Sequence, residues 1–79
     1  MSERRQLPRV TAVVRLWNAD AGWGVLDSPS LPDGCWAHFS VIESPGYAAL
    51  TAGQHVLVDA EEPGQDGFPF RATRVAPQI

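Results

Sequence analysis

The sequence predicts an all-β protein in which five short strands form a closed or nearly closed antiparallel barrel. Five segments are rich in β-branched and aromatic residues, and they recur at a spacing of roughly ten residues. No segment between them has the length and periodicity of a good helix. A chain of 79 residues forms one domain, and we expect residues 1–8 to be a flexible N-terminal extension.

The first two strands are joined by the turn-forming segment NADAG. Strand one is expected over residues 9–17, where counting by twos separates Val10, Ala12 and Val14 on one face from Thr11, Val13, Arg15 and Trp17 on the other. Strand two is expected over residues 22–28. Its glycines beside Trp23 indicate that another backbone or a ligand comes close.

The remaining strands follow from similar patterns. Residues 28–34 predict a turn, and strand three, residues 35–39, places the small Cys35 and Ala37 toward the core and Trp36 and His38 on the opposite side. Residues 40–54 predict a short helical turn and a loop that carries Tyr47. Residues 55–61 form strand four, and strand five over residues 68–76 begins at an edge or after Pro69. A small SH3-like barrel has a similar number of strands, so the pattern leaves that topology open.

Composition excludes several classes of function. No apolar run is long enough to span a bilayer, and the start MSERRQLPRV lacks the apolar segment of a signal peptide, so we expect a cytoplasmic protein. Cys35 and two histidines cannot supply a zinc site of four clustered ligands, and we expect no metal and no other cofactor. No phosphate-binding glycine loop or catalytic triad is present, so we expect no enzyme. The net charge of −3 argues mildly against binding that depends on phosphate contacts.

The candidate binding residues gather on one face of the predicted barrel. If strands one to three form a meander, the face opposite the core collects Arg15, Trp17, Trp23, Val25, Trp36 and His38. An outward aromatic cluster usually marks a binding surface, and flat rings on a rigid sheet are suited to stacking unpaired bases. The alternative is that the rings pack the barrel or a dimer interface.

Two motifs on these strands resemble the cold-shock domain. RLWNADAGWGVL and CWAHFS are similar to its two ribonucleoprotein motifs, and the resemblance extends through GYAALTAGQHVLVD to cover about residues 9–76. It implies a five-stranded OB-type barrel that binds single-stranded RNA or DNA, with pyrimidine-rich strands preferred. It also implies an RNA chaperone or a regulator of transcription or translation, with a monomer expected and a dimer open. The family's basic strand-one residue falls on Arg15, and its stacking residues fall on Trp17, Trp23, Trp36, His38, Phe39 and Tyr47.

Some positions depart from the family pattern. Ala21 replaces a lysine, while Val25 and Leu16 replace rings, and losing two stacks predicts binding weaker by about a hundredfold. Strict alternation also puts Leu16 and Phe39 on the core side, whereas the family places both near the nucleic acid, and a bulge or strand end would reconcile the two.

Two further alternatives stay open. Arg71 lies at the rim of the binding face, or it only neutralises a nearby acid. For the whole domain, the alternative function is a diverged OB domain whose aromatic face mediates protein–protein contact or self-association.

Overall fold

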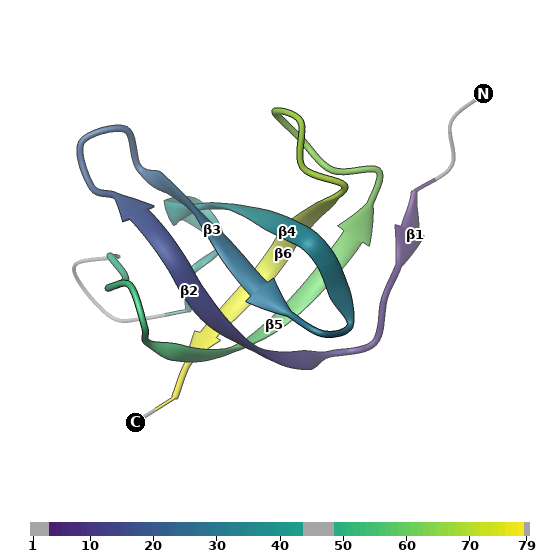
Figure 1. The fold of residues 1–79 in the computed structure, drawn as a ribbon, viewed down its shortest axis with the longest axis horizontal. Coiled ribbons are helices and arrows are strands. Elements are labelled where there is room, and N and C mark those ends of the chain that lie inside the picture. Colours follow the sequence, from purple (N-terminus) through teal and green to yellow (C-terminus); the bar gives the residue numbers. More distant parts are fainter. Residues whose placement is uncertain (1–3, 44–48, 79) are drawn as a thin grey trace.

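The computed structural model describes residues 4–43 and 49–78 and shows a closed barrel of five strands with a short sixth strand on its outside (Figure 1). In chain order the elements are β1 (Arg5–Gln6), β2 (Val10–Asn18), β3 (Trp23–Ser28), β4 (Leu31–His38), the 3-10 helix η1 (Phe39–Val41), β5 (His55–Glu62) and β6 (Phe70–Pro77). Within those two ranges no helix is long and apolar enough to cross a membrane.

The barrel closes through the sheet order β5-β2-β3-β4-β6, with β5 also pairing with β6. This confirms the predicted all-β OB-type barrel. One part of the prediction needs correction, because β4 and β6 run parallel while all the other pairs are antiparallel. Strand direction cannot alternate all the way around a closed ring of five, since the number is odd, so one parallel pair is unavoidable.

The strand boundaries differ from the sequence prediction mainly at β4. This strand begins at Leu31 rather than at residue 35, because the chain reverses within the two residues Pro29 and Ser30. The turn residues Asp33 and Gly34 have positive φ angles of 73° and 102°, so they bend the strand without ending it. At the other end of the chain β6 begins after Pro69, which is one of the two predicted starts.

Part of the N-terminal segment forms a paired strand. Residues 5 and 6 form β1, which pairs with the last two residues of β5, and the amide of Leu7 donates to the carbonyl of Ala60 at 2.9 Å. Arg4 and Arg5 form ion pairs with Glu61 and Glu62. Residues 5 and 6 thus form a paired strand within the segment that was expected to be flexible, while residues 1–3 lie outside the described residues.

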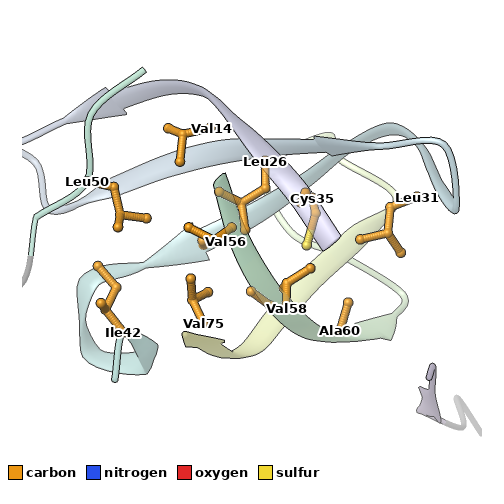
Figure 2. Packing of buried hydrophobic residues seen from close by; sticks show 13 residues of the cluster. Val14, Leu26, Leu31, Cys35, Ile42, Leu50, Val56, Val58, Ala60 and Val75 are labelled. Carbon is orange, nitrogen blue, oxygen red and sulfur yellow. The ribbon is translucent and has the colours of Figure 1, made fainter. Parts of the chain in front are cut away.

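The core lies between the strands and consists of small and medium aliphatic side chains (Figure 2). The predicted alternation is confirmed on β2, where Ala12 and Val14 point inward, and on β4, where Cys35 and Ala37 do so. The buried cluster contains Ala12, Val14, Leu26, Leu31, Cys35, Ala37, Ile42, Leu50, Val56, Val58, Ala60, Ala72 and Val75. Small core side chains keep the barrel narrow, so the large rings are left for its ends and its outer surface.

A β-bulge in β2 sets which side chains face outward. The register with β3 shifts between Val14, which pairs with Leu26, and Leu16, which pairs with Val25. The extra residue reverses the alternation, so Leu16 is 40% exposed while Trp17 packs against the core cluster. The prediction that Trp17 shares the outer face is wrong for this reason, and the anticipated bulge does place Leu16 outside.

Gly24 accommodates the redirected Trp17 ring. A Cβ atom at Gly24 would lie 2.3 Å from Cε3 of Trp17 and 2.4 Å from the carbonyl oxygen of Leu16. The glycine in strand two therefore marks a close approach, as the sequence indicated, and both approaching groups belong to β2.

We predict that Gly24→Ala lowers the free energy of unfolding by about 3 kcal/mol, because the added Cβ would overlap both the Trp17 ring and the backbone carbonyl of Leu16. Gly53→Ala is the control: a Cβ there meets no atom within 4 Å, and only the φ of 91° opposes it, at a cost of about 1 kcal/mol. Urea unfolding followed by circular dichroism measures both. Equal losses in the two variants would contradict this account of Gly24.

Candidate functional site

Cross-strand pairing defines the outer face of the β2–β3–β4 meander. Val25 pairs with Leu16 on one side and with Trp36 on the other, and Trp23 pairs with His38. Directly opposed residues share a face, and the intervening pair is Gly24–Ala37, of which Ala37 points into the core. Leu16, Trp23, Val25, Trp36 and His38 are therefore side by side on the outside of the barrel.

Four rings form a continuous row on this face and just beyond it. The ring centroids of Trp23 and Trp36 are 6.5 Å apart with planes inclined by 22°, and those of Trp36 and His38 are 5.9 Å apart at 21°. His38 and Phe39 follow at 4.5 Å and 41°. We call Trp23, Trp36, His38 and Phe39 the aromatic row. Its first three rings are nearly parallel, an arrangement that presents flat apolar surfaces in one direction.

The aromatic row is unevenly exposed. Phe39 is 47% exposed and Trp23 and His38 are half-buried, whereas Trp36 is only 8% exposed and Val25 is completely buried. The predicted outward face is therefore largely inaccessible to solvent at Val25 and Trp36. A ligand would meet Phe39, Trp23 and His38 first.

Local hydrogen bonds fix the end of the row. The amide of Phe39 donates to the carbonyl of Gly22 at 2.8 Å, and a Cβ atom at Gly22 would lie 2.8 Å from the Phe39 ring. Nδ1 of His38 accepts from the amide of Ser40 at 3.3 Å and lies 2.8 Å from its hydroxyl oxygen. With Nδ1 engaged as an acceptor, the neutral imidazole carries its proton on Nε2 and can donate there.

Arg15 lies on the same face but is already paired. Its Nη2 donates to Oδ1 of Asp27 at 2.6 Å, and its Nε lies 3.0 Å from both carboxylate oxygens. This hydrogen bonding raises the pKa of Arg15 above its usual value. The guanidinium carbon is 6.0 Å from the ring centroid of Phe68, and the absent side chain of Gly34 leaves room for both groups beside Val25.

Arg71 lies on the opposite flank, where β6 pairs in parallel with β4 and Arg71 is opposite Trp36. Its guanidinium forms an ion pair with Glu61, which is only 6% exposed and is also paired with Arg4. A second hydrogen bond of 3.4 Å runs from Arg71 to Oε1 of Gln65. The geometry favours the interpretation in which Arg71 neutralises an acid, since two cations surround a buried carboxylate.

This pairing extends to every arginine of the protein. The ion pairs are Arg4–Glu61, Arg5–Glu62, Arg9–Asp59, Arg15–Asp27, Arg71–Glu61 and Arg74–Glu43. The chain has six basic residues in total, all of them arginine. A phosphate that approaches the barrel would therefore have to compete with a carboxylate for each guanidinium, which weakens any binding based on charge alone.

The predicted site residues thus separate into groups. Trp23, Val25, Trp36, His38 and Phe39 come together, with Arg15 at one flank and Arg71 at the other. Trp17 faces the core, and Tyr47 lies outside the described residues. Sequence reasoning missed Phe68, which lies in the β5–β6 connection and places its ring beside the guanidinium of Arg15. The local pattern does not indicate a contact between residues so far apart in the sequence.

Cys35 and the acidic groups show no reactive arrangement. Within residues 4–43 and 49–78, no three His, Cys, Asp or Glu side chains gather as a metal-binding group. Cys35 is completely buried on the core side of β4, and burial raises the pKa of its thiol to about 12. The thiol is therefore protonated at neutral pH and faces away from His38.

We predict that Cys35 does not react with Ellman's reagent at pH 8 in the folded protein, because both burial and the raised pKa of the thiol suppress the thiolate. The same sample in concentrated urea serves as the control and is expected to react with one equivalent per chain. Rapid reaction of the folded protein would contradict the buried position of Cys35.

Comparison with known proteins identifies relatives across most of the chain. No family model matches it. It is 42% identical over 65 residues to cold shock protein 2 of Lactiplantibacillus plantarum, covering 82% of this chain and 92% of the relative. A major cold shock protein of Streptococcus pyogenes is 41% identical over 54 residues, with 68% and 78% covered, and one of Bacillus cereus is 38% identical over 53 residues, with 67% and 78% covered. The extent of these matches, together with the five-stranded barrel, shows that the chain belongs to the cold shock protein family.

Proposed function

We propose that the protein binds single-stranded RNA or DNA by stacking unpaired bases on the aromatic row, without catalysing a reaction. The observation that carries this proposal is the row itself, in which three rings are nearly parallel and the end ring is 47% exposed. Each base stacked on such a ring contributes about 1–3 kcal/mol, whatever its identity. A duplex would not bind in this way, because its bases are already stacked on each other.

Charge has a secondary role in this proposal. Every arginine is paired with a carboxylate, and the net charge is −3. Few counterions would be released from the strand, so the dependence of affinity on salt should be shallow. Stacking supplies most of the affinity under these conditions, which fits a protein that binds many strands weakly.

Pyrimidine-rich strands are the expected ligands. Sequence preferences of stacking proteins arise from stacking strength and backbone flexibility, and pyrimidines stack weakly on one another and are therefore more available. Weak, sequence-tolerant binding of this kind suits an RNA chaperone that keeps transcripts unstructured in the cytoplasm, or a regulator of transcription or translation.

A fluorescence titration tests the proposal. We expect oligothymidine to quench tryptophan fluorescence at low salt and the corresponding duplex to have little effect. Phe39→Ala should weaken binding about tenfold, because it removes one stacking ring. Val13→Ala is the matched control, since Val13 is 36% exposed on β2 but is not part of the aromatic row, and its affinity should stay unchanged. No quenching at tens of micromolar strand would overturn the proposal.

The same face also suits a second function. Leu16 and Phe39 are exposed apolar side chains, and such a surface can bind a protein or a second copy of the chain. Light scattering separates the two functions. A mass twice that of one chain, reduced to the monomer mass by Phe39→Ala and accompanied by no quenching, would favour self-association over nucleic-acid binding.

We further predict that Asp27→Asn strengthens oligothymidine binding and steepens its salt dependence. The substitution frees Arg15 beside the aromatic row, and one additional phosphate contact changes the slope of log K against log salt by about −0.7. Glu43→Gln removes the same charge and frees Arg74, which lies on β6 away from the row, and should leave the slope nearly unchanged. Identical slopes in the two variants would contradict the role given to the Arg15–Asp27 pair.

A further inference from the structure

The centre of the aromatic row contains a hydrogen-bond donor without an acceptor. Nε1 of Trp36 is inaccessible to solvent, and no atom of the described residues accepts a hydrogen bond from it. It is the single buried side-chain nitrogen or oxygen in that state within residues 4–43 and 49–78. Leaving such a donor unpaired costs free energy, so a ligand that supplies the acceptor gains the free energy of this hydrogen bond on binding.

The position of Trp36 connects this donor with the proposed ligand. Its ring neighbours those of both Trp23 and His38, which are half-buried and inclined to it by only 22° and 21°. Opposite it on β3 is Val25, whose side chain is smaller than a ring and has no acceptor. A base stacked on Trp23 or His38 therefore has its edge near Trp36. Because Nε1 is inaccessible in the free protein, a contact with that edge requires one of the two half-buried rings to rotate.

The free-energy cost of removing an acceptor from water favours a neutral base carbonyl over a phosphate as the partner of Nε1. A phosphate would have to lose its water beside a donor that is itself neutral, and Arg71, opposite Trp36, is occupied by Glu61. Burying a neutral carbonyl oxygen with one hydrogen bond costs far less than burying an anion. A carbonyl at the edge of a base thus fits this donor better than the backbone of the strand does.

We propose that Nε1 of Trp36 donates a hydrogen bond to a carbonyl oxygen of a base bound on the aromatic row. This interaction gives a stacking surface some selectivity, because a base that stacks equally well but lacks the carbonyl acceptor leaves the indole unpaired. The inference rests on the proposed function and specifies how the central residue of that surface takes part. A phenylalanine at this position would stack on a base but could not discriminate between bases with and without a carbonyl acceptor.

The test compares two ligands and two matched variants. The ligands are oligothymidine and the same strand carrying 2,4-difluorotoluene, a ring with the shape of thymine whose fluorines are poor acceptors; both are DNA, so no 2′-hydroxyl is present. The variants are Trp36→Phe and Trp23→Phe, which make the same change on the same row. The affinities of the wild-type protein and of both variants for both ligands, six in all, are measured by fluorescence anisotropy of labelled strands and form one double-mutant cycle for each tryptophan.

The preference of each protein is the ratio of its affinity for oligothymidine to its affinity for the difluorotoluene strand. We expect this ratio to be about tenfold larger for the wild-type protein and for Trp23→Phe than for Trp36→Phe. Equal preferences in Trp36→Phe and Trp23→Phe would overturn the inference while leaving stacking intact. Failure of the wild-type protein to bind oligothymidine would instead overturn the proposed function.

Nuclear magnetic resonance of the unaltered protein gives a second readout that does not depend on how the variants fold. The indole proton of Trp36 should move downfield on addition of oligothymidine and much less with the difluorotoluene strand, because only the first accepts a strong hydrogen bond. Equal movement with both strands would show that the signal reports ring stacking alone, which would contradict the proposed bond.

Discussion

The β-bulge between Val14 and Leu16 is the constraint on which the functional face depends. Without it, the alternation along β2 would point Leu16 into the barrel and Trp17 outward. With it, Trp17 packs against the core and over Gly24, while Arg15 and Leu16 flank Val25 on the outside. A single unpaired residue therefore directs the Trp17 ring to the core and leaves the aromatic row, our proposed binding surface, on the outside.

The ion pairs and the aromatic row together indicate that stacking contributes more to the proposed binding than charge does. Each arginine is held by a carboxylate, so the surface has little free positive charge to attract phosphates. In the proposed function, base stacking on the rings of Trp23, Trp36, His38 and Phe39 supplies an interaction that needs no charged side chain. The buried carboxylate of Glu61 forms ion pairs with two arginines, Arg4 of the N-terminal segment and Arg71 beside the aromatic row.

Local patterns predicted most of the elements because each strand carries its own signal. The small residues Cys35 and Ala37 correctly located the core face of β4. The sequence placed Val25, Trp36, Trp23 and His38 on one face, and the structure pairs Trp36 with Val25 and His38 with Trp23 on that face. Boundaries were harder to predict: a segment whose composition predicts a turn, residues 31–34, continues β4 because Asp33 and Gly34 bend the strand without breaking it.

The sequence by itself determined the all-β class, the inward-facing residues and the motifs that carry the aromatic rings, since these depend on neighbours close in the chain. Only the tertiary structure decided that Trp17 turns inward, that Val25 and Trp36 are covered, and that each arginine has a carboxylate partner. These outcomes depend on contacts between distant segments, such as Arg15 with Phe68 and Arg71 with Glu61. Periodicity within a strand does not encode a register shift or a partner on another strand, so folding has to occur before either is fixed.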